Sequence, residues 1–215
     1  MQNKQSHIIL EKRELSPSVF ALRLERNGFM FDPGQYVFIN LPGDENVREY
    51  SVYSGIQDPY IEFLIKEVSD GFISKKLKKL NPGDKLELEG PYGFFTINES
   101  FRSTPPLLLV ATGTGISPFH SFIRSEPSLK YRLLHGVRYG YETYEKTFYN
   151  NYVLCTSRDT AGDYHGRVTP YQKNNPVNRE YLCYLSGNFG MVEDMTDILI
   201  KQGFPVQHIY SEVHN

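Results

Sequence analysis

LLLVATGTGISPF, residues 107–119, is the stretch of sequence that decides the fold. An apolar run opens it, and Gly113, Thr114 and Gly115 follow before a segment with helical character. An unbroken apolar run is typical of a parallel strand that is covered on both faces. A glycine-rich turn after such a strand lets backbone amides approach a phosphate at the amino end of the next helix. The stretch therefore predicts a nucleotide-binding strand–turn–helix unit, although glycines in such turns are as often purely structural.

Strand and helix patterns alternate downstream of this unit. This alternation is typical of a doubly wound α/β domain with a parallel sheet and right-handed crossovers. Ser186, Gly187 and Asn188 form a second close-approach turn, with Met191 just beyond it. Two such turns at the carboxyl ends of parallel strands mark the place where a ligand binds. The predicted strands are 131–137, 152–157, 181–187 and 206–213, and the predicted helices are 117–124 and 188–203.

Upstream of Pro105 the pattern changes to short alternating strands separated by turns such as NG, DPG and NPGD. One helix interrupts them, because Ile73, Leu77 and Leu80 share a face and lysines occupy the other. We therefore expect two domains, an antiparallel β-barrel over 1–101 and a doubly wound parallel-sheet α/β domain over 102–215. The predicted strands of the barrel are 19–26, 36–41, 48–54, 60–68 and 85–90, and its helix is 71–80.

The composition excludes several classes of function. The 215 residues carry 23 basic and 25 acidic side chains, a formal charge of -2, which leaves no footprint for nucleic acid or an anionic membrane. No apolar run reaches transmembrane length and the amino terminus lacks a secretory signal, so we expect a cytoplasmic protein. Cys155 and Cys183 lie in separate apolar runs, where we expect buried thiols rather than a disulfide or an iron–sulfur centre. We expect no metal site.

The ends of the second-domain strands indicate which nucleotide binds. An acidic residue at the end of the third strand would favour NAD, because it binds the ribose hydroxyls, whereas serine and arginine suit a 2'-phosphate. Ser157 and Arg158 stand at that position, Arg138 ends the previous strand, and Arg167 follows shortly after. Because the arginines are clustered, we interpret them as a binding site for the 2'-phosphate of NADPH. The alternative is that they are ordinary solvated side chains.

These motifs stand in an order that resembles the ferredoxin-NADP reductase family over nearly the whole chain. The R-x-Y-S flavin motif of the family stands at residues 48–51, followed by a second serine at Ser54, and its G-x-x-S motif stands at 71–74. Residues 33–36 and 90–94 match two further stretches of the barrel, and 113–118 match the nicotinamide-nucleotide turn. The arginine set falls where NADPH-using bacterial members carry theirs.

The resemblance implies a role for each motif. Arg48 would neutralise the FAD pyrophosphate together with the amides that open the 71–80 helix, Tyr50 would lie flat against the isoalloxazine, and Ser51 would bond its N5 edge. Glu212 matches a carboxylate that relays protons, so the implied catalytic residues are Tyr50, Ser51 and Glu212. The implied cofactor-binding residues are Arg48, Tyr50, Ser51, Ser54, Lys66, Gly71, Phe72, Ile73 and Ser74 for FAD, and Gly113, Thr114, Gly115, Arg138, Ser157, Arg158, Arg167, Gly187, Asn188 and Met191 for NADPH.

Two departures from the family pattern stand near the carboxyl terminus. Ser186 and Phe189 replace the cysteine and proline that many members carry beside the nicotinamide, so the geometry of hydride transfer would differ. Members commonly end in an aromatic residue that covers the flavin or its adenine, whereas this chain ends in residues 211–215, SEVHN. His214 either substitutes for that aromatic or belongs to a frayed terminus.

The resemblance implies an NADPH-dependent flavoprotein reductase, monomeric, that transfers hydride from NADPH to FAD and then single electrons to a ferredoxin or flavodoxin. Three alternatives stay open: a free-flavin or small-molecule reductase of the same fold, a non-catalytic nucleotide sensor, and a reductase subunit of a larger oxygenase system. Ferredoxins and flavodoxins are typically acidic, so a lysine-rich helix face would be suited to dock them. The alternative is that these lysines only form the solvated face of the helix. The candidate lysines are Lys75, Lys76, Lys78 and Lys79.

Overall fold

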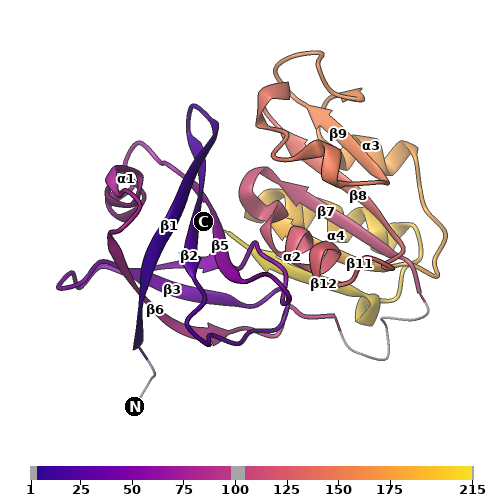
Figure 1. Cartoon of the computed structure of the whole chain (residues 1–215). Coiled ribbons are helices and arrows are strands. Elements are labelled where there is room, and N and C mark those ends of the chain that lie inside the picture. The colour runs from indigo at the N-terminus through magenta and orange to yellow at the C-terminus, as the bar shows by residue number, and fades with distance from the viewer. Residues whose placement is uncertain (1–3, 98–104, 215) are drawn as a thin grey trace. The chain divides into compact units, whose positions relative to one another are not determined.

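The computed structural model describes residues 4–97 and 105–214 and divides the chain into two compact units (Figure 1). The first unit comprises Met1–Ile97 with Ser117–Pro127, and the second comprises Asn98–Ile116 with Ser128–Asn215. The helix after the first glycine turn therefore groups with the first unit. The predicted boundary between 101 and 102 lies outside the described residues and stays a prediction. In the described ranges, no helix has the length and apolar character needed to cross a membrane.

The first unit is a six-stranded antiparallel sheet in the order β4-β3-β6-β1-β2-β5. Its edge strands are joined by an antiparallel bridge between Val52, just after β4, and Phe63 of β5, so the sheet closes into a barrel. This confirms the antiparallel β-barrel expected for the first half of the chain. The strands are β1 Lys4–Ser16, β2 Val19–Glu25, β3 Tyr36–Asn40, β4 Arg48–Ser51, β5 Tyr60–Lys66 and β6 Lys85–Tyr92.

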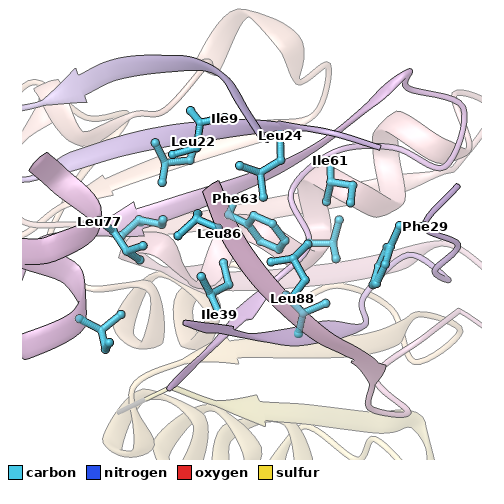
Figure 2. Close-up of a cluster of buried hydrophobic side chains, with 14 of the residues drawn as sticks. Ile9, Leu22, Leu24, Phe29, Ile39, Ile61, Phe63, Leu77, Leu86 and Leu88 are labelled. Atoms are coloured by element: carbon cyan, nitrogen blue, oxygen red, sulfur yellow. The ribbon is translucent and has the colours of Figure 1, made fainter. Parts of the chain in front are cut away.

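A single apolar core fills this barrel (Figure 2). Alternate residues of the strands point inward, as the period of a strand requires. Helix α1, Phe72–Lys79, closes one part of the core by burying Ile73 and Leu77. The Lys12 ammonium group donates to the carbonyls of Lys78 and Leu80 at 2.9 and 2.8 Å, which satisfies the carboxyl end of the helix. The labelled core residues of Figure 2 are Ile9, Leu22, Leu24, Phe29, Ile39, Ile61, Phe63, Leu77, Leu86 and Leu88.

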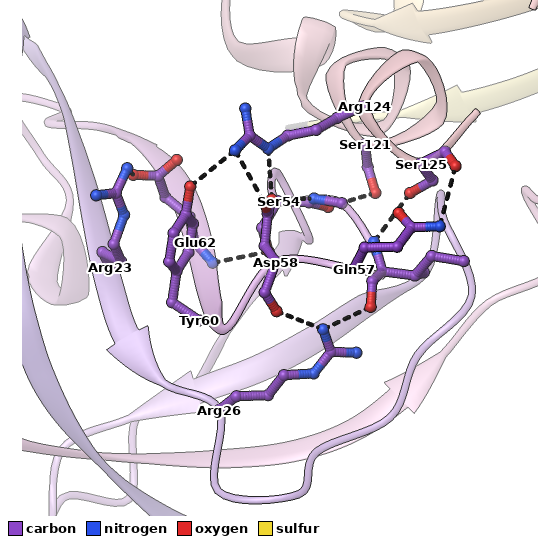
Figure 3. A network of polar contacts seen from close by, with 12 residues as sticks. Arg23, Arg26, Ser54, Gln57, Asp58, Tyr60, Glu62, Ser121, Arg124 and Ser125 are labelled. Atoms are coloured by element: carbon purple, nitrogen blue, oxygen red, sulfur yellow. Dashed lines mark hydrogen bonds and ion pairs between the residues drawn. The ribbon is translucent and has the colours of Figure 1, made fainter. Parts of the chain in front are cut away.

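Helix α2, Ser117–Ser125, is held to the barrel by a polar network (Figure 3). Arg124 forms an ion pair with Asp58 and donates to the Tyr60 hydroxyl at 3.0 Å. The Ser121 hydroxyl donates to the carbonyl of Ser54 at 2.7 Å. Burial alone would raise the pKa of Asp58, but the hydrogen bonds from Arg124 and the amide of Gly55 outweigh it and leave that pKa below its usual value. The carboxylate is therefore charged at neutral pH and fixes the helix.

The second unit is a parallel sheet in the order β10-β9-β8-β7-β11-β12, and it confirms the doubly wound α/β fold. The chain runs outward from β7 through β8 and β9, then returns to the other side of β7 for β11 and β12, so the topological switch point lies between β7 and β11. Cys155 and Cys183 are free and buried, as expected. The elements are β7 Leu107–Thr112, β8 Tyr131–Val137, β9 Tyr152–Thr156, β10 Tyr164–His165, α3 Val168–Asn174, β11 Leu182–Gly187, α4 Phe189–Lys201 and β12 Ile209–Val213. Short 3-10 helices are η2 Gly113–Ile116, η3 Gly140–Glu142, η4 Lys146–Phe148 and η5 Val206–His208.

Candidate functional site

The R-x-Y-S motif forms β4 at an edge of the barrel sheet. Arg48 pairs in register with Ile39 and Tyr50 with Val37, so the guanidinium and the phenol share one face of the strand. Arg48 is exposed, Ser51 is buried, and Tyr50 packs half-buried against the barrel core. Burial, opposed in part by the charge of Arg48, raises the pKa of Tyr50 to about 12. The phenol is therefore a neutral aromatic surface beside a cation at neutral pH.

The G-x-x-S motif forms the amino end of α1. Gly71 is the N-cap in an extended conformation, no side chain caps the helix, and its first turn holds no acidic residue. A Cβ atom at Gly71 would lie 2.4 Å from the Ser74 hydroxyl oxygen, so the tight approach needs glycine. The Ser74 hydroxyl accepts a hydrogen bond from the amide of Val68 at 3.2 Å and holds this turn. A helix end without its own cap is an anion site, so these residues fit a flavin pyrophosphate.

Two further predicted FAD residues have positions that serve the fold. Ser54 is fully buried, its hydroxyl accepts a hydrogen bond from the amide of Glu62 at 3.0 Å, and its carbonyl accepts one from Ser121. Lys66 is half-buried at the end of β5, in register with Val19. Their contact with the cofactor stays a prediction, and the structure gives Ser54 a role at the junction between the barrel and α2.

In the second unit the two glycine turns lie against each other at the switch point. A Cβ atom at Gly115 would lie 2.5 Å from the carbonyl oxygen of Ser186. Gly187 has a φ of 153°, and a Cβ there would lie 2.1 Å from the hydroxyl oxygen of Thr112. The same Thr112 oxygen accepts hydrogen bonds from the backbone and side-chain nitrogens of Asn188 at 3.3 and 3.1 Å. The structure thus brings the predicted turns together and adds Thr112, which the sequence analysis missed.

The residues after the second turn begin α4. The Asn188 side-chain oxygen accepts a hydrogen bond from the Met191 amide at 3.0 Å and caps the helix. Met191 is buried in the core of this unit, and its predicted contact with NADPH stays a prediction. Phe189, which replaces the family proline, is exposed by 63%.

The three predicted arginines lie at the carboxyl edge of the same sheet. The amide of Arg158 donates to the carbonyl of Arg138 at 2.9 Å, and Arg167 is the N-cap of α3, two residues after the end of β10, the short strand paired with β9. All three side chains are exposed, as is Ser157. In residues 105–214, none of the three guanidinium groups forms a hydrogen bond or an ion pair with another side chain. The edge therefore carries positive charge without an internal counter-ion.

The nearby carboxylates are committed to backbone amides. Asp159 accepts hydrogen bonds from the amides of Gly140 and Ala161 at 2.7 and 3.2 Å, and the bond from Gly140 is the largest cause of its lowered pKa. Glu142, which is buried, accepts hydrogen bonds from the amides of Arg138 and Tyr139 at 2.9 and 3.1 Å. These carboxylates hold the two loops in place and leave the arginines available to an anionic ligand.

The carboxyl terminus is tied to the second glycine turn. The His214 amide donates to the carbonyl of Gly187 at 2.8 Å, and its Nε2 atom lies 2.8 Å from the Ser186 hydroxyl oxygen and 3.4 Å from a carboxylate oxygen of Glu212. Burial lowers the pKa of His214, so the imidazole is neutral at pH 7. The departures at Ser186 and His214 therefore form one cluster with Glu212. The sequence analysis named all three residues but did not connect them.

Matches to known proteins agree with these motifs. A family model described as an oxidoreductase FAD-binding domain matches residues 7–97. The chain is 33% identical to the toluate 1,2-dioxygenase electron transfer component of Pseudomonas putida, over 93% of this chain and 64% of that protein. It is 40% identical to ferredoxin-NADP reductase B of Sorangium cellulosum, over 53% of this chain and 48% of that protein. The chain thus spans less than two thirds of these two relatives.

A solved structure shares the fold over the whole chain. The crystal structure of a ferredoxin NADP+ reductase from Neisseria gonorrhoeae with bound FAD and NADP superposes with a TM-score of 0.89, covering 99% of each chain at 22% identity. At that identity the likeness establishes the architecture, a barrel followed by a doubly wound sheet.

Proposed function

We propose that the chain is a member of the ferredoxin-NADP reductase family of FAD-binding oxidoreductases, and that it is an NADPH-dependent reductase that passes electrons singly to a ferredoxin or flavodoxin. The observation that carries the proposal is the second unit's sheet edge, where two glycine turns meet and three exposed arginines form no ion pair with any of the described residues. Such an edge suits a dinucleotide that bears a 2'-phosphate. Residues 1–101 would hold FAD and 102–215 NADPH, in a cytoplasmic protein.

The residues of the first unit would bind and orient the flavin. Bound FAD would supply hydride acceptance and stepwise electron release, and this chemistry belongs to the cofactor. Arg48 and the uncapped amides of α1 would neutralise the pyrophosphate. Tyr50 would cover a ring face with a phenol that stays protonated, and Ser51 would offer a hydroxyl to the ring edge.

The residues of the second unit would bind NADPH and handle the proton. The paired glycine turns would admit its pyrophosphate, and Arg158 and Arg167 would hold the 2'-phosphate by charge-assisted hydrogen bonds. Glu212 shares the neutral His214 imidazole with Ser186, so a proton on the carboxyl group could exchange through this cluster. The proposed catalytic residues remain Tyr50, Ser51 and Glu212.

The first test concerns flavin binding. Freshly purified protein is expected to release FAD on heating, and NADPH is expected to bleach its visible absorbance. Arg48→Ala should weaken FAD retention at least tenfold, since it removes a charge-assisted contact of about 1.5–3 kcal/mol. Glu49→Ala is the matched control, because Glu49 is also exposed but its position in the strand places it on the opposite face of β4. FMN alone, or no flavin, would contradict the proposal.

A reductase component of an oxygenase system is the second candidate function. It is favoured by the match to the toluate 1,2-dioxygenase electron transfer component, which covers 93% of this chain. The two candidates share the chemistry and differ in the electron acceptor. Rates of NADPH oxidation with a ferredoxin, a flavodoxin and an oxygenase component, each added to the same enzyme, decide between them.

Helix α1 offers a basic surface for such an acceptor, but only part of the lysine run is available. Lys76 forms an ion pair with Asp44 at 2.5 Å and lies over the ring of Phe72, and Lys78 forms an ion pair with Glu14. Lys75 and Lys79, one helical turn apart, are exposed. A positive pair beside the proposed flavin site would raise the encounter rate with an acidic carrier.

Charge reversal at Lys75 and Lys79 to glutamate is expected to slow electron transfer to an acidic carrier several-fold at low salt. The difference from wild type should shrink as ionic strength rises, because exposed charges are screened. Reduction of ferricyanide by NADPH should stay near the wild-type rate. The control is Lys85→Glu with Lys201→Glu, which changes the net charge equally at exposed sites that are not part of α1. If the rate of electron transfer to the carrier changes neither with the charge reversal nor with ionic strength, the carrier does not dock on α1.

A further inference from the structure

A buried histidine holds the first glycine turn from below. His135 of β8 is fully buried, and its Nε2 atom lies 2.9 Å from the carbonyl oxygen of Gly113. Its Nδ1 atom lies 2.8 Å from the hydroxyl of Tyr152 in β9. His135 follows the apolar pair Leu133 and Leu134 in β8, and the sequence analysis assigned it no role. A polar side chain in that position needs a reason, because burying one costs free energy unless it is fully bonded.

The two hydrogen bonds have fixed directions. A carbonyl oxygen can only accept, so the Nε2 atom of His135 must carry the hydrogen that it donates to Gly113. A neutral imidazole carries one hydrogen, so Nδ1 accepts, and the Tyr152 hydroxyl must donate to it. Burial lowers the pKa of His135 to about 4, which keeps the ring neutral at pH 7. Tyr152 thus selects the tautomer that can hold Gly113.

The carbonyl group that His135 bonds is that of Gly113, the first residue of the glycine turn. Gly113 has a φ of 53° and opens the 3-10 helix η2, whose Gly115 lies against the carbonyl of Ser186. Because a peptide unit is planar, fixing the carbonyl of Gly113 also fixes the plane of the peptide that follows. The direction of the turn's amides toward a phosphate therefore depends on a side chain one strand away.

We propose that His135, oriented by Tyr152, is a positioning residue for the pyrophosphate of the pyridine nucleotide, a role that rests on the proposed function. It touches neither the nucleotide nor the reacting atoms and acts through the Gly113 carbonyl. An apolar residue of similar size would pack against the same neighbours but would leave that carbonyl without its buried partner. The turn would then have more than one orientation, and the pyrophosphate would meet misaligned amides.

The test measures binding of two probes to the FAD-loaded protein by calorimetry. NADP+ contains the pyrophosphate, whereas 2',5'-ADP carries the 2'-phosphate but no dinucleotide pyrophosphate. His135→Leu should weaken NADP+ at least tenfold and leave 2',5'-ADP within about twofold. His135→Gln should recover most of the NADP+ affinity, because its amide can donate to Gly113 from a position near that of Nε2. Tyr152→Phe should fall between them, since the ring remains but the tautomer is no longer selected.

Tyr131→Phe is the matched control, because it removes a largely buried hydroxyl at the other end of β8, where it accepts a hydrogen bond from the amide of Asn150 at 3.0 Å. It should leave both affinities unchanged. Equal losses for both probes, or an unaltered NADP+ affinity in His135→Leu, would overturn the positioning role. If His135→Leu does not fold, the glutamine and phenylalanine variants decide by the same criterion. If the wild-type protein binds neither probe, the proposed function and the positioning role of His135 are both wrong. If it binds both probes, the variants test the positioning role alone.

Discussion

Replacing Arg158 and Arg167 together with alanine is expected to lower kcat/KM for NADPH between about tenfold and a hundredfold while leaving that for NADH near wild type. Each guanidinium would make a charge-assisted contact with the 2'-phosphate, worth about 1.5–3 kcal/mol, and solvent exposure places both at the low end of that range. The two contacts then sum to about 3 kcal/mol, or roughly two orders of magnitude. NADH has no 2'-phosphate and loses nothing.

The control for this prediction removes two positive charges elsewhere in the same unit. Lys130 precedes β8, at the end of the strand opposite Arg138, and Lys201 ends α4. Both are exposed, so replacing both with alanine changes the net charge equally without touching the arginine edge. NADPH kinetics of this control should match wild type. Equal losses for NADPH and NADH in the arginine variant would mean that Arg158 and Arg167 serve the fold, and the preference for NADPH would then need another source.

The sequence predicts the parallel sheet better than any other part of the chain. The run at 107–112 and the strand at 131–137 coincide with β7 and β8, because buried parallel strands are continuously apolar and glycine-rich turns mark where they end. The predicted strand at 206–213 is half right, since its first residues form a 3-10 helix before β12 begins at Ile209. The two-residue strand β10 and the short helix α3 were not predicted, because neither contains an apolar run.

The longest strand of the barrel was missed. β1 has 13 residues, yet its alternation is broken by register shifts between Ile9 and Glu11 and between Glu14 and Ser16, which move side chains to the opposite face. Its charged residues also make it look like an exposed tail. Arg13 is in fact paired with the buried carboxylate of Glu62 at 2.9 Å, and this partner lies far away in sequence. A sequence pattern gives information about residues that are close along the chain, and it does not reveal an ion pair between residues that are distant in sequence.

In the candidate site, too, local features were predictable from the sequence, whereas contacts between distant residues were not. Local motifs predicted the glycine turns, the arginines and the segments proposed to bind flavin, because each is a short run whose residue types suit a particular role. The bonds that fix these runs come from other strands: Thr112 to Asn188, His135 to Gly113, and Ser186 to His214. The register of the parallel sheet creates these pairs, and no spacing along one segment encodes it. A histidine directly after two leucines in a predicted buried strand, as at His135, is a local signal that could have indicated one of these bonds.

Gly115→Ala is expected to weaken NADP+ binding more than tenfold and to destabilise the second unit by about 2–3 kcal/mol, the upper part of the usual range for overpacking, because backbone atoms cannot move aside as a side chain can. The new Cβ would lie 2.5 and 2.8 Å from the carbonyl oxygen and carbon of Ser186 and 3.0 Å from the Cα of Gly187. All three atoms are backbone, so the two turns must separate. Separation would also remove the approach of Gly187 to Thr112, on which the shape of the nucleotide site depends.

Two other glycines separate this steric effect from the general cost of replacing glycine. Gly190, in the first turn of α4, has only the Asn188 side-chain oxygen near a new Cβ, at 3.7 Å, and gains helix propensity, so Gly190→Ala should be neutral or stabilising by about 0.5–1 kcal/mol. Gly113 has open space around it but a φ of 53°, so Gly113→Ala should cost only about 1–2 kcal/mol of strain. Urea unfolding and NADP+ titration of the three variants give the ranking. A Gly115→Ala protein no less stable than Gly113→Ala, with NADP+ affinity intact, would show that the turns do not need their contact, and the nucleotide would then have to be held by the arginine edge alone.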